Sequence, residues 1–263
     1  FMNLQPSELM KIGLIAFLAK YYHRIPAQDV NRIKFLFLPI VALVSPVLLV
    51  VAQPDLGTSI LIALGGITVA WLAGVRVKFF AYASILFISL MPIAISFLKP
   101  YQKARILTFL NPDRDPLGAG YQIIQSKIAI GSGGLFGKGF LNGSQSYLDY
   151  LPEKHTDFIF TLFSEEFGFL GSIFILLLYV LIILRIINIG NLTRSNFGKL
   201  YCYSFVTAFF IYVTVNMGMV LGLLPIVGAP LPIMSYGGSS MMAIMLGLGI
   251  VMSCKIYKDT PVN

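Results

Sequence analysis

The chain is built from apolar blocks of about 20 residues, the length that crosses the hydrocarbon core of a bilayer as a helix. Of its 263 residues, 57% are hydrophobic and only 11% are charged. Soluble domains carry roughly a quarter charged residues, and a soluble fold has no means of burying so many apolar blocks. The sequence therefore predicts an all-α integral membrane protein.

We expect a polytopic helical bundle of about seven transmembrane helices, forming a single transmembrane domain over 1–263. Its helices are predicted at residues 6–23, 34–52, 56–74, 79–98, 158–187, 200–223 and 234–254. The segment 224–238 is rich in proline and glycine, and each proline removes a backbone donor. Such backbone is tolerated at membrane depth only where protein or a wet cavity shields it, so a re-entrant or broken-helix element is predicted there.

Basic residues of the short connections gather on one side of this bundle. They are Lys20, Arg24, Arg32, Lys34, Arg76, Lys78, Arg185, Arg194, Lys199, Lys255 and Lys258. The opposite short connections carry no Lys or Arg, so the basic side is cytoplasmic, and this side rather than nucleic acid explains the net charge of +8. The long loop 99–157 is then extracytoplasmic. The chain would also begin outside, so we expect an odd number of upstream spans to be missing.

The long loop 99–157 holds the polar residues from which a site could be built. Asp157 precedes a predicted helix, where its carboxylate either caps the helix or acts as a general base beside Lys154 and His155. His155 is a competing base. Four isoleucines of the loop have the spacing of an amphipathic helix on the membrane surface. They are Ile123, Ile124, Ile128 and Ile130.

The glycine-rich stretch 131–139 lacks the spacing of a phosphate-binding loop and follows no predicted strand. Its backbone, with Lys127 and Lys138, could still approach a phosphate. Equally, the glycines could serve only to let the loop pack closely on the bundle. The sequence leaves both interpretations open.

Charged residues inside a span are expensive and suggest function. Glu8 and Lys11 lie three apart in the first helix, where they could form a buried structural pair or line a cavity. Glu165 and Glu166 lie two turns into the helix that follows Asp157. The two cysteines lie in or at the end of apolar runs and are expected to be packing residues, with no disulfide and no metal site.

Several segments, in order over nearly the whole chain, resemble the SEDS family of membrane proteins (shape, elongation, division, sporulation). They are Gln5–Glu8 with Lys11, then 53–59, 115–121, 125–134, 151–160 and 232–240. The segment 224–232 resembles the elongation branch of the family more than the division branch. The family fold has ten spans, and the helices predicted here match its last seven.

The resemblance implies a peptidoglycan glycosyltransferase that polymerises lipid II for cell-wall elongation. It would lie in the bacterial cytoplasmic (inner) membrane, with the loop on the periplasmic face. A class B penicillin-binding protein and the elongation machinery are the implied partners. The essential carboxylate of the family maps onto Asp157, as catalytic general base. A lipid II flippase and a non-catalytic scaffold for the penicillin-binding protein are the alternatives.

The implied substrate is an undecaprenyl-pyrophosphate-linked glycan, and its expected contacts come from the first helix and the loop. They are Glu8, Lys11, Lys127, Lys138, Glu153, Lys154 and His155. The leaving pyrophosphate would be stabilised by Lys127, Lys138 or Lys154, or by a divalent cation, Mg²⁺ or Mn²⁺. No other cofactor and no protein-borne metal site is expected.

Overall fold

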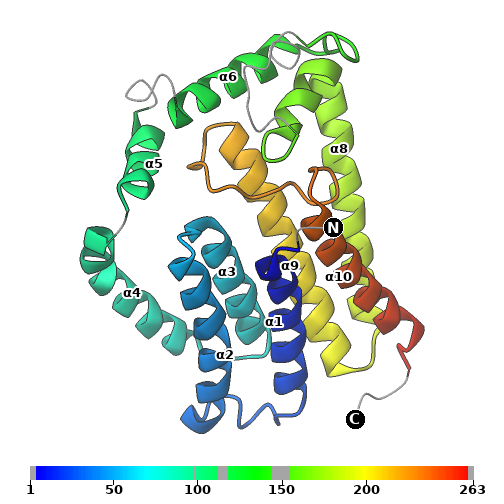
Figure 1. Ribbon diagram of the computed structural model, residues 1–263. Helices are drawn as coiled ribbons and strands as arrows, with labels where there is room; N and C mark the ends of the chain where they lie inside the picture. The colour runs from blue at the N-terminus through cyan, green and yellow to red at the C-terminus, as the bar shows by residue number, and fades with distance from the viewer. Residues whose placement is uncertain (1–3, 98, 112–117, 144–154, 260–263) are drawn as a thin grey trace. The chain divides into compact units, whose positions relative to one another are not determined.

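The computed structural model describes residues 4–97, 99–111, 118–143 and 155–259. Within these ranges the chain is all-helical, with nine helices (Figure 1). They are α1 (Pro6–His23), α2 (Ile33–Ala52), α3 (Leu56–Leu72), α4 (Val77–Phe97), α5 (Pro100–Leu110), α6 (Ala119–Ser132), α8 (Ile159–Leu192), α9 (Asn196–Val220) and α10 (Gly238–Ile256).

Seven of the described helices, α1 to α4 and α8 to α10, lie where the sequence predicts helices. Their ends differ from the prediction by a few residues; α8, for example, continues to Leu192, and α10 begins at Gly238 rather than at residue 234. The other two described helices lie in the long loop. Of these, α6 contains the predicted amphipathic stretch, whereas α5 has no counterpart in the prediction.

Four of the described helices, α2, α8, α9 and α10, are long and apolar enough to cross a membrane. Helix α3 and the Val77–Pro92 part of α4 are apolar but shorter. Large apolar side chains on these helices are exposed, among them Phe87 and Leu181, as expected of surfaces that face lipid. The chain is a multi-pass membrane protein.

The chain forms two compact units. Unit 1 consists of Phe1–Val77, Tyr179–Tyr212 and Tyr236–Asn263, and unit 2 consists of Lys78–Leu178 and Val213–Ser235. Helices α8 and α9 therefore contribute residues to both units.

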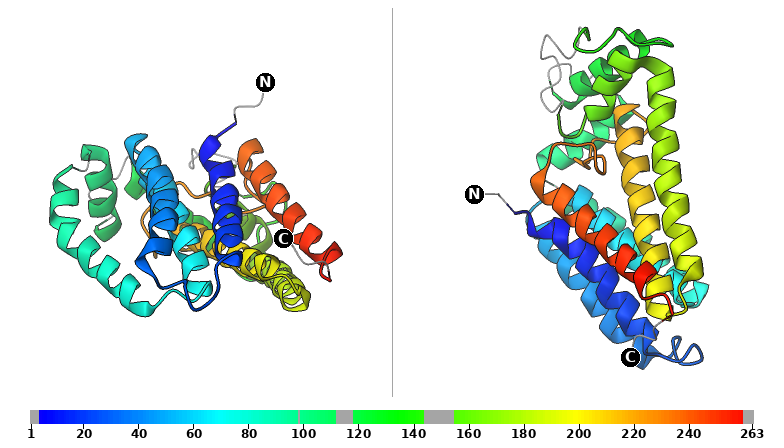
Figure 2. Two further views of the ribbon diagram at one scale, coloured as in Figure 1. Left: turned by 90° about the horizontal axis from the view of Figure 1, so that it is seen from below. Right: turned by 90° about the vertical axis from the view of Figure 1, so that its right-hand side faces the viewer.

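Close helix packing holds unit 1 together. Helix α1 contacts α2, α3 and α10, and α1 and α10 lie side by side in Figure 2. A Cβ added to Gly66 of α3 would lie 2.4 Å from Cδ1 of Leu43 and 3.3 Å from Cδ2 of Leu14. A Cβ on Gly247 of α10 would lie 2.2 Å from Cε2 of Phe205. Small residues let membrane helices approach one another in this way.

In unit 2, helix α8 is broken at Gly168, whose φ of 67° and ψ of −162° are not helical. This conformation is essentially restricted to glycine. The break removes helical hydrogen bonds, and the loop after α6 replaces them with its own backbone groups. The four bonds, donor N–H first, run from Lys138 to Glu165 (3.0 Å), Gly139 to Glu166 (3.0 Å), Phe169 to Gly134 (2.9 Å) and Leu170 to Leu135 (3.2 Å).

The glycines of this loop are required by the contact with α8. A Cβ on Gly137, which has a φ of +81°, would lie 2.0 Å from the carbonyl oxygen of Glu166. A Cβ on Gly133 would lie 2.2 Å from the carbonyl oxygen of Ser164. Of the two interpretations of 131–139, the structure shows close packing. The N–H groups of Lys138 and Gly139 donate to carbonyls of α8, and contact of Lys127 or Lys138 with a phosphate stays a prediction.

Replacing Gly137 by alanine should therefore destabilise the protein by about 2 kcal/mol or more, because the new Cβ would overlap backbone atoms at a strained φ. Gly131→Ala is the matched control, since a Cβ there would meet no atom within 4 Å. The measurement is the thermal unfolding midpoint of each variant in detergent. Equal midpoints for the two variants would contradict the packing described above.

Candidate active site

Asp157 lies half-buried in the turn that leads into α8. The helix begins at Ile159, and the carbonyl of Phe158 accepts a hydrogen bond from the N–H of Thr161 at 3.0 Å. Asp157 is the second residue before the helix, and the interpretation that its carboxylate caps the helix stays a prediction. Phe158 is 1% exposed and anchors the turn in unit 2.

The backbone of this turn is held by a side chain of α9. Asn216 is fully buried, and its Nδ2 donates to the carbonyl of Asp157 at 2.9 Å and to that of Ala229 at 2.6 Å. Ala229 belongs to residues 221–235, which follow α9 and are called here the Pro/Gly segment. The side-chain amide of Asn216 therefore connects the turn to the Pro/Gly segment by hydrogen bonds.

A second side chain, that of Ser235, is hydrogen-bonded to the turn one residue earlier. Ser235 Oγ donates to the carbonyl of Thr156 at 2.6 Å and accepts from the N–H of Leu231 at 2.7 Å. Close by in sequence, Ile233 has a φ of +69°, which is rare for a β-branched residue. Backbone strain persists only where the surrounding structure enforces it, and it clusters at functional sites.

The carboxylate of Asp157 lies beside Gly228 of the Pro/Gly segment. A Cβ on Gly228 would lie 3.6 Å from Oδ2 of Asp157. Gly228 has a φ of +71°, a conformation that favours glycine. The Pro/Gly segment therefore passes the carboxylate at a residue that has no side chain.

Two exposed cations lie along the same segment. Arg105 of α5 donates from Nη1 to the carbonyl of Ile226 at 3.4 Å. Lys127 of α6 lies against Gly222, where an added Cβ would be 2.7 Å from its Nζ. Lys127 is one of the predicted substrate contacts. Arg105 is not, because a single basic residue in a long loop gives no signal by its type alone.

Within unit 2, a polar contact joins helix α6 to α8 and to the end of α9. Ser126, fully buried, lies 2.7 Å from Thr161 Oγ1 and donates to the carbonyl of Val220 at 2.7 Å. The isoleucines predicted to face the membrane surface divide between two environments, since Ile123 is buried and Ile128 is 48% exposed. Part of the predicted apolar face therefore packs on protein.

Lys138, another predicted substrate contact, is bound to a buried carboxylate. Its Nζ lies 2.7 Å from Oε1 of Glu165, whose side chain is 0% exposed, while that of Lys138 is 28% exposed. The ion pair joins the glycine-rich loop to the first part of α8, next to the break at Gly168. It fits a structural role for Glu165 and Lys138.

Glu8 and Lys11 form the buried pair that their spacing allows. Lys11 Nζ lies 2.6 Å from Glu8 Oε1, with the two side chains 10% and 7% exposed. The ammonium also lies 4.2 Å from the centre of the Tyr212 ring. This pair belongs to unit 1, whereas Asp157 belongs to unit 2. Whether the pair also lines a cavity remains a prediction.

Two predicted contacts, Glu153 and Lys154, lie outside the described residues. His155 is described and is exposed. Over the described ranges, no group of three or more His, Cys, Asp or Glu side chains could hold a metal ion.

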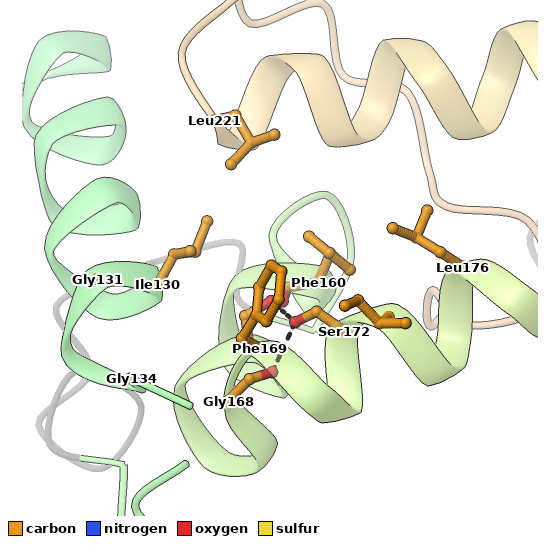
Figure 3. A pocket seen from close by; sticks show the side chains of 11 residues that line it. Ile130, Gly131, Gly134, Phe160, Gly168, Phe169, Ser172, Leu176 and Leu221 are labelled. Carbon is orange, nitrogen blue, oxygen red and sulfur yellow. Dashed lines mark hydrogen bonds between the residues drawn. The ribbon is translucent and has the colours of Figure 1, made fainter. Parts of the chain in front are cut away.

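An apolar pocket of about 270 Å³ lies along the broken part of α8 in unit 2. Figure 3 shows Ile130 and Leu221 across from Phe160, Phe169 and Leu176. The polar groups at its base already have partners: Ser172 Oγ lies within hydrogen-bond distance of the carbonyl of Gly168, at 2.8 Å, and of Ser164 Oγ, at 2.9 Å (Figure 3). The lining that remains is suited to an aliphatic chain.

The FtsW/RodA/SpoVE family model, described as cell cycle protein, matches residues 1–260. The chain belongs to the SEDS family. Among relatives of this SEDS chain, the peptidoglycan glycosyltransferase MrdB of Escherichia coli K12 is 47% identical over 97% of the chain and 68% of MrdB. Stage V sporulation protein E of Bacillus subtilis is 38% identical over 97% of the chain and 69% of that protein.

Solved SEDS structures match the described fold. A chain of a peptidoglycan synthase complex, reported for its structural coordination of polymerization and crosslinking, has a TM-score of 0.77 at 35% identity; the match covers 98% of this chain and 71% of that one. The rod shape-determining protein RodA of Thermus thermophilus has a TM-score of 0.66 at 27% identity, over 98% of this chain and 67% of RodA.

Removing the positive charge of Lys138 tests its structural role. Lys138→Met should lower the free energy of unfolding by about 3 kcal/mol, because it removes the ammonium from a buried carboxylate. Adding Glu165→Gln should recover part of this loss. Unfolding midpoints of both variants in detergent are the measurement, with Lys127→Met as a control on an exposed lysine. A stable Lys138→Met protein would contradict the role.

Proposed function

We propose that Asp157 is the general base of this peptidoglycan glycosyltransferase of the SEDS family. The observation that carries this proposal is that two buried side chains, Asn216 and Ser235, hold the backbone on both sides of its Cα. A general base must lie within hydrogen-bond reach of the hydroxyl that it deprotonates, so a fixed backbone contributes directly to catalysis.

In the proposed reaction, the 4-hydroxyl of the acceptor sugar attacks the anomeric carbon of the lipid-linked donor. A new glycosidic C–O bond forms as the C–O bond to pyrophosphate breaks, and the hydroxyl proton passes to Asp157. The polyprenyl pyrophosphate leaves with the electron pair of the broken bond. Attack opposite the leaving group inverts the anomeric centre and produces a β-linked strand.

The charge that develops on the pyrophosphate requires a cation. Lys127 and Arg105 are the described candidates that suit this role, since both are exposed and both lie along the Pro/Gly segment that passes Asp157. Lys138 suits it less, because it pairs with Glu165. A divalent cation, Mg²⁺ or Mn²⁺, is the alternative source of positive charge.

The lipid tail of the substrate requires an apolar surface near the polar site. The pocket beside Phe160 and Phe169 supports this part of the proposal, because it is apolar and belongs to the same unit as Asp157. The predicted contacts of Glu8 and Lys11 with the lipid headgroup remain part of the proposal, as do those of Glu153, Lys154 and His155.

We place the protein in the bacterial cytoplasmic membrane, with seven spans and the loop 99–157 on the outer face, where lipid-linked precursors are polymerised. In this arrangement the Pro/Gly-rich stretch 224–238 is re-entrant. A class B penicillin-binding protein is the proposed partner, supported by the similarity to a chain of a complex that coordinates polymerization and crosslinking.

Asp157→Asn should reduce glycan polymerisation by at least about 100-fold, because it removes the base and keeps the side-chain shape. The assay measures glycan length made from labelled lipid II in detergent, in the presence of the class B partner. Asp259→Asn is the control for the same chemical change at an exposed carboxylate. Near-normal polymerisation by Asp157→Asn would remove Asp157 from the mechanism, and a large loss in His155→Gln would favour His155.

The same assay separates the alternative functions. A detergent micelle has no leaflets to cross, so a flippase would lengthen no glycan there. A scaffold would bind the penicillin-binding protein and also lengthen no glycan. Glycan growth that depends on Asp157 contradicts both alternatives.

Replacing the two exposed cations tests the leaving-group contacts. Lys127→Gln and Arg105→Gln should each raise the KM for lipid II about two- to fivefold, the range expected for an exposed charge pair. Lys103→Gln is the control, because Lys103 lies on the same helix as Arg105 and donates to the carbonyl of Ser96. An unchanged KM in both variants would exclude these residues as pyrophosphate contacts.

A further inference from the structure

We infer that Asn216 is a positioning residue for Asp157, acting through the backbone of the turn that carries the carboxylate. The inference rests on the proposed role of Asp157. It adds a residue from α9 to a site otherwise formed by the long loop and the Pro/Gly segment.

The first argument is the geometry of the amide. Both N–H bonds of Asn216 Nδ2 are used, one on the carbonyl of Asp157 and one on the carbonyl of Ala229. Ala229 follows Gly228, which lies beside Oδ2 of Asp157. One side chain therefore sets the distance between the backbone that carries the carboxylate and the backbone that passes it.

The second argument is that the nitrogen of the amide has hydrogen-bond partners and its oxygen has none among the described residues. Asn216 is 0% exposed, and its Oδ1 has no hydrogen-bond partner among the described residues. A buried acceptor without a partner costs about 1–3 kcal/mol. Natural structures contain few such groups, and their presence at a site calls for an explanation. A donor function that the site requires provides one.

The third argument is the absence of a regular element to hold the turn. Residues 155–158 form turns and the Pro/Gly segment has no helix, so neither ladder nor helix hydrogen bonds fix them to each other. Ser235 makes one contact with the turn, through Thr156. Asn216 makes a contact at Asp157 itself.

The test separates positioning from mere stability. Asn216→Ser shortens the side chain, and Asn216→Asp keeps its shape but turns oxygen toward both carbonyls. For each variant, the stoichiometry of lipid II binding gives the number of molecules that can bind substrate. The Kd, the KM and the kcat per binding-competent molecule are then measured with the class B partner present. Asn196→Ser is the matched control, because Asn196 is exposed on the same helix.

If Asn216 positions Asp157, Asn216→Ser should lower kcat per binding-competent molecule at least tenfold, with KM and Kd within threefold of the unchanged protein. Asn216→Asp should lower it further. A merely structural residue would instead reduce the number of binding-competent molecules and leave kcat per molecule unchanged, which overturns the inference.

A second variant keeps the test decisive if Asn216 variants fail to fold. Ser235→Ala removes the neighbouring tie at Thr156 and should lower kcat by a smaller factor, again with KM unchanged. Ser240→Ala is its control, since Ser240 bonds only locally to Gly237 in the described contacts. An unchanged kcat in Ser235→Ala would then overturn the idea that the tied turn positions the base. Asp157→Asn in the same assay distinguishes this failure from failure of the proposed function.

Discussion

Irregular backbone at membrane depth needs hydrogen-bond partners from the protein or from water in a cavity, and unit 2 supplies them by pairing irregular segments with each other. The break in α8 at Gly168 is matched by the glycine-rich loop, through four backbone hydrogen bonds. The turn at Asp157 is matched by the Pro/Gly segment, through Asn216 and Ser235. In each case one segment supplies what the other lacks, so a change to either should affect both.

This arrangement explains how a site can be built from irregular backbone in unit 2. In the interior of a helix the backbone groups bond to each other and side chains surround them, so backbone there is poorly placed to approach a reacting group. Glycine at positive φ allows such an approach, and Gly228 shows it beside the carboxylate of Asp157. In the proposed site, the backbone that carries Asp157 is held by the buried amide of Asn216 rather than by helical hydrogen bonds.

The charged residues divide by burial into two groups, and this division supports different proposed roles for them. Lys11 and Lys138 each lie within 2.7 Å of a buried carboxylate, which offsets the cost of removing a charge from water. Lys127 and Arg105 are exposed and remain accessible to a ligand. Residue type alone does not separate these lysines, because a paired and a ligand-binding lysine look the same in a sequence. Their environments in the folded chain do separate them.

The sequence by itself determined the seven helices α1 to α4 and α8 to α10, the membrane class, the family and the position of the candidate base, because apolar block length and local motifs are properties of contiguous residues. It missed α5, and it began α10 four residues too early, since Ser235 bonds to Leu231 and Thr156 instead of starting the helix. Only the tertiary structure decided that Asn216 holds Asp157, that Lys138 pairs with Glu165, and that the glycines of 131–139 close a broken helix. The two residues of the ion pair lie 27 positions apart in the sequence, and Asn216 lies 59 positions from Asp157. Contacts between residues so far apart leave no local sequence pattern.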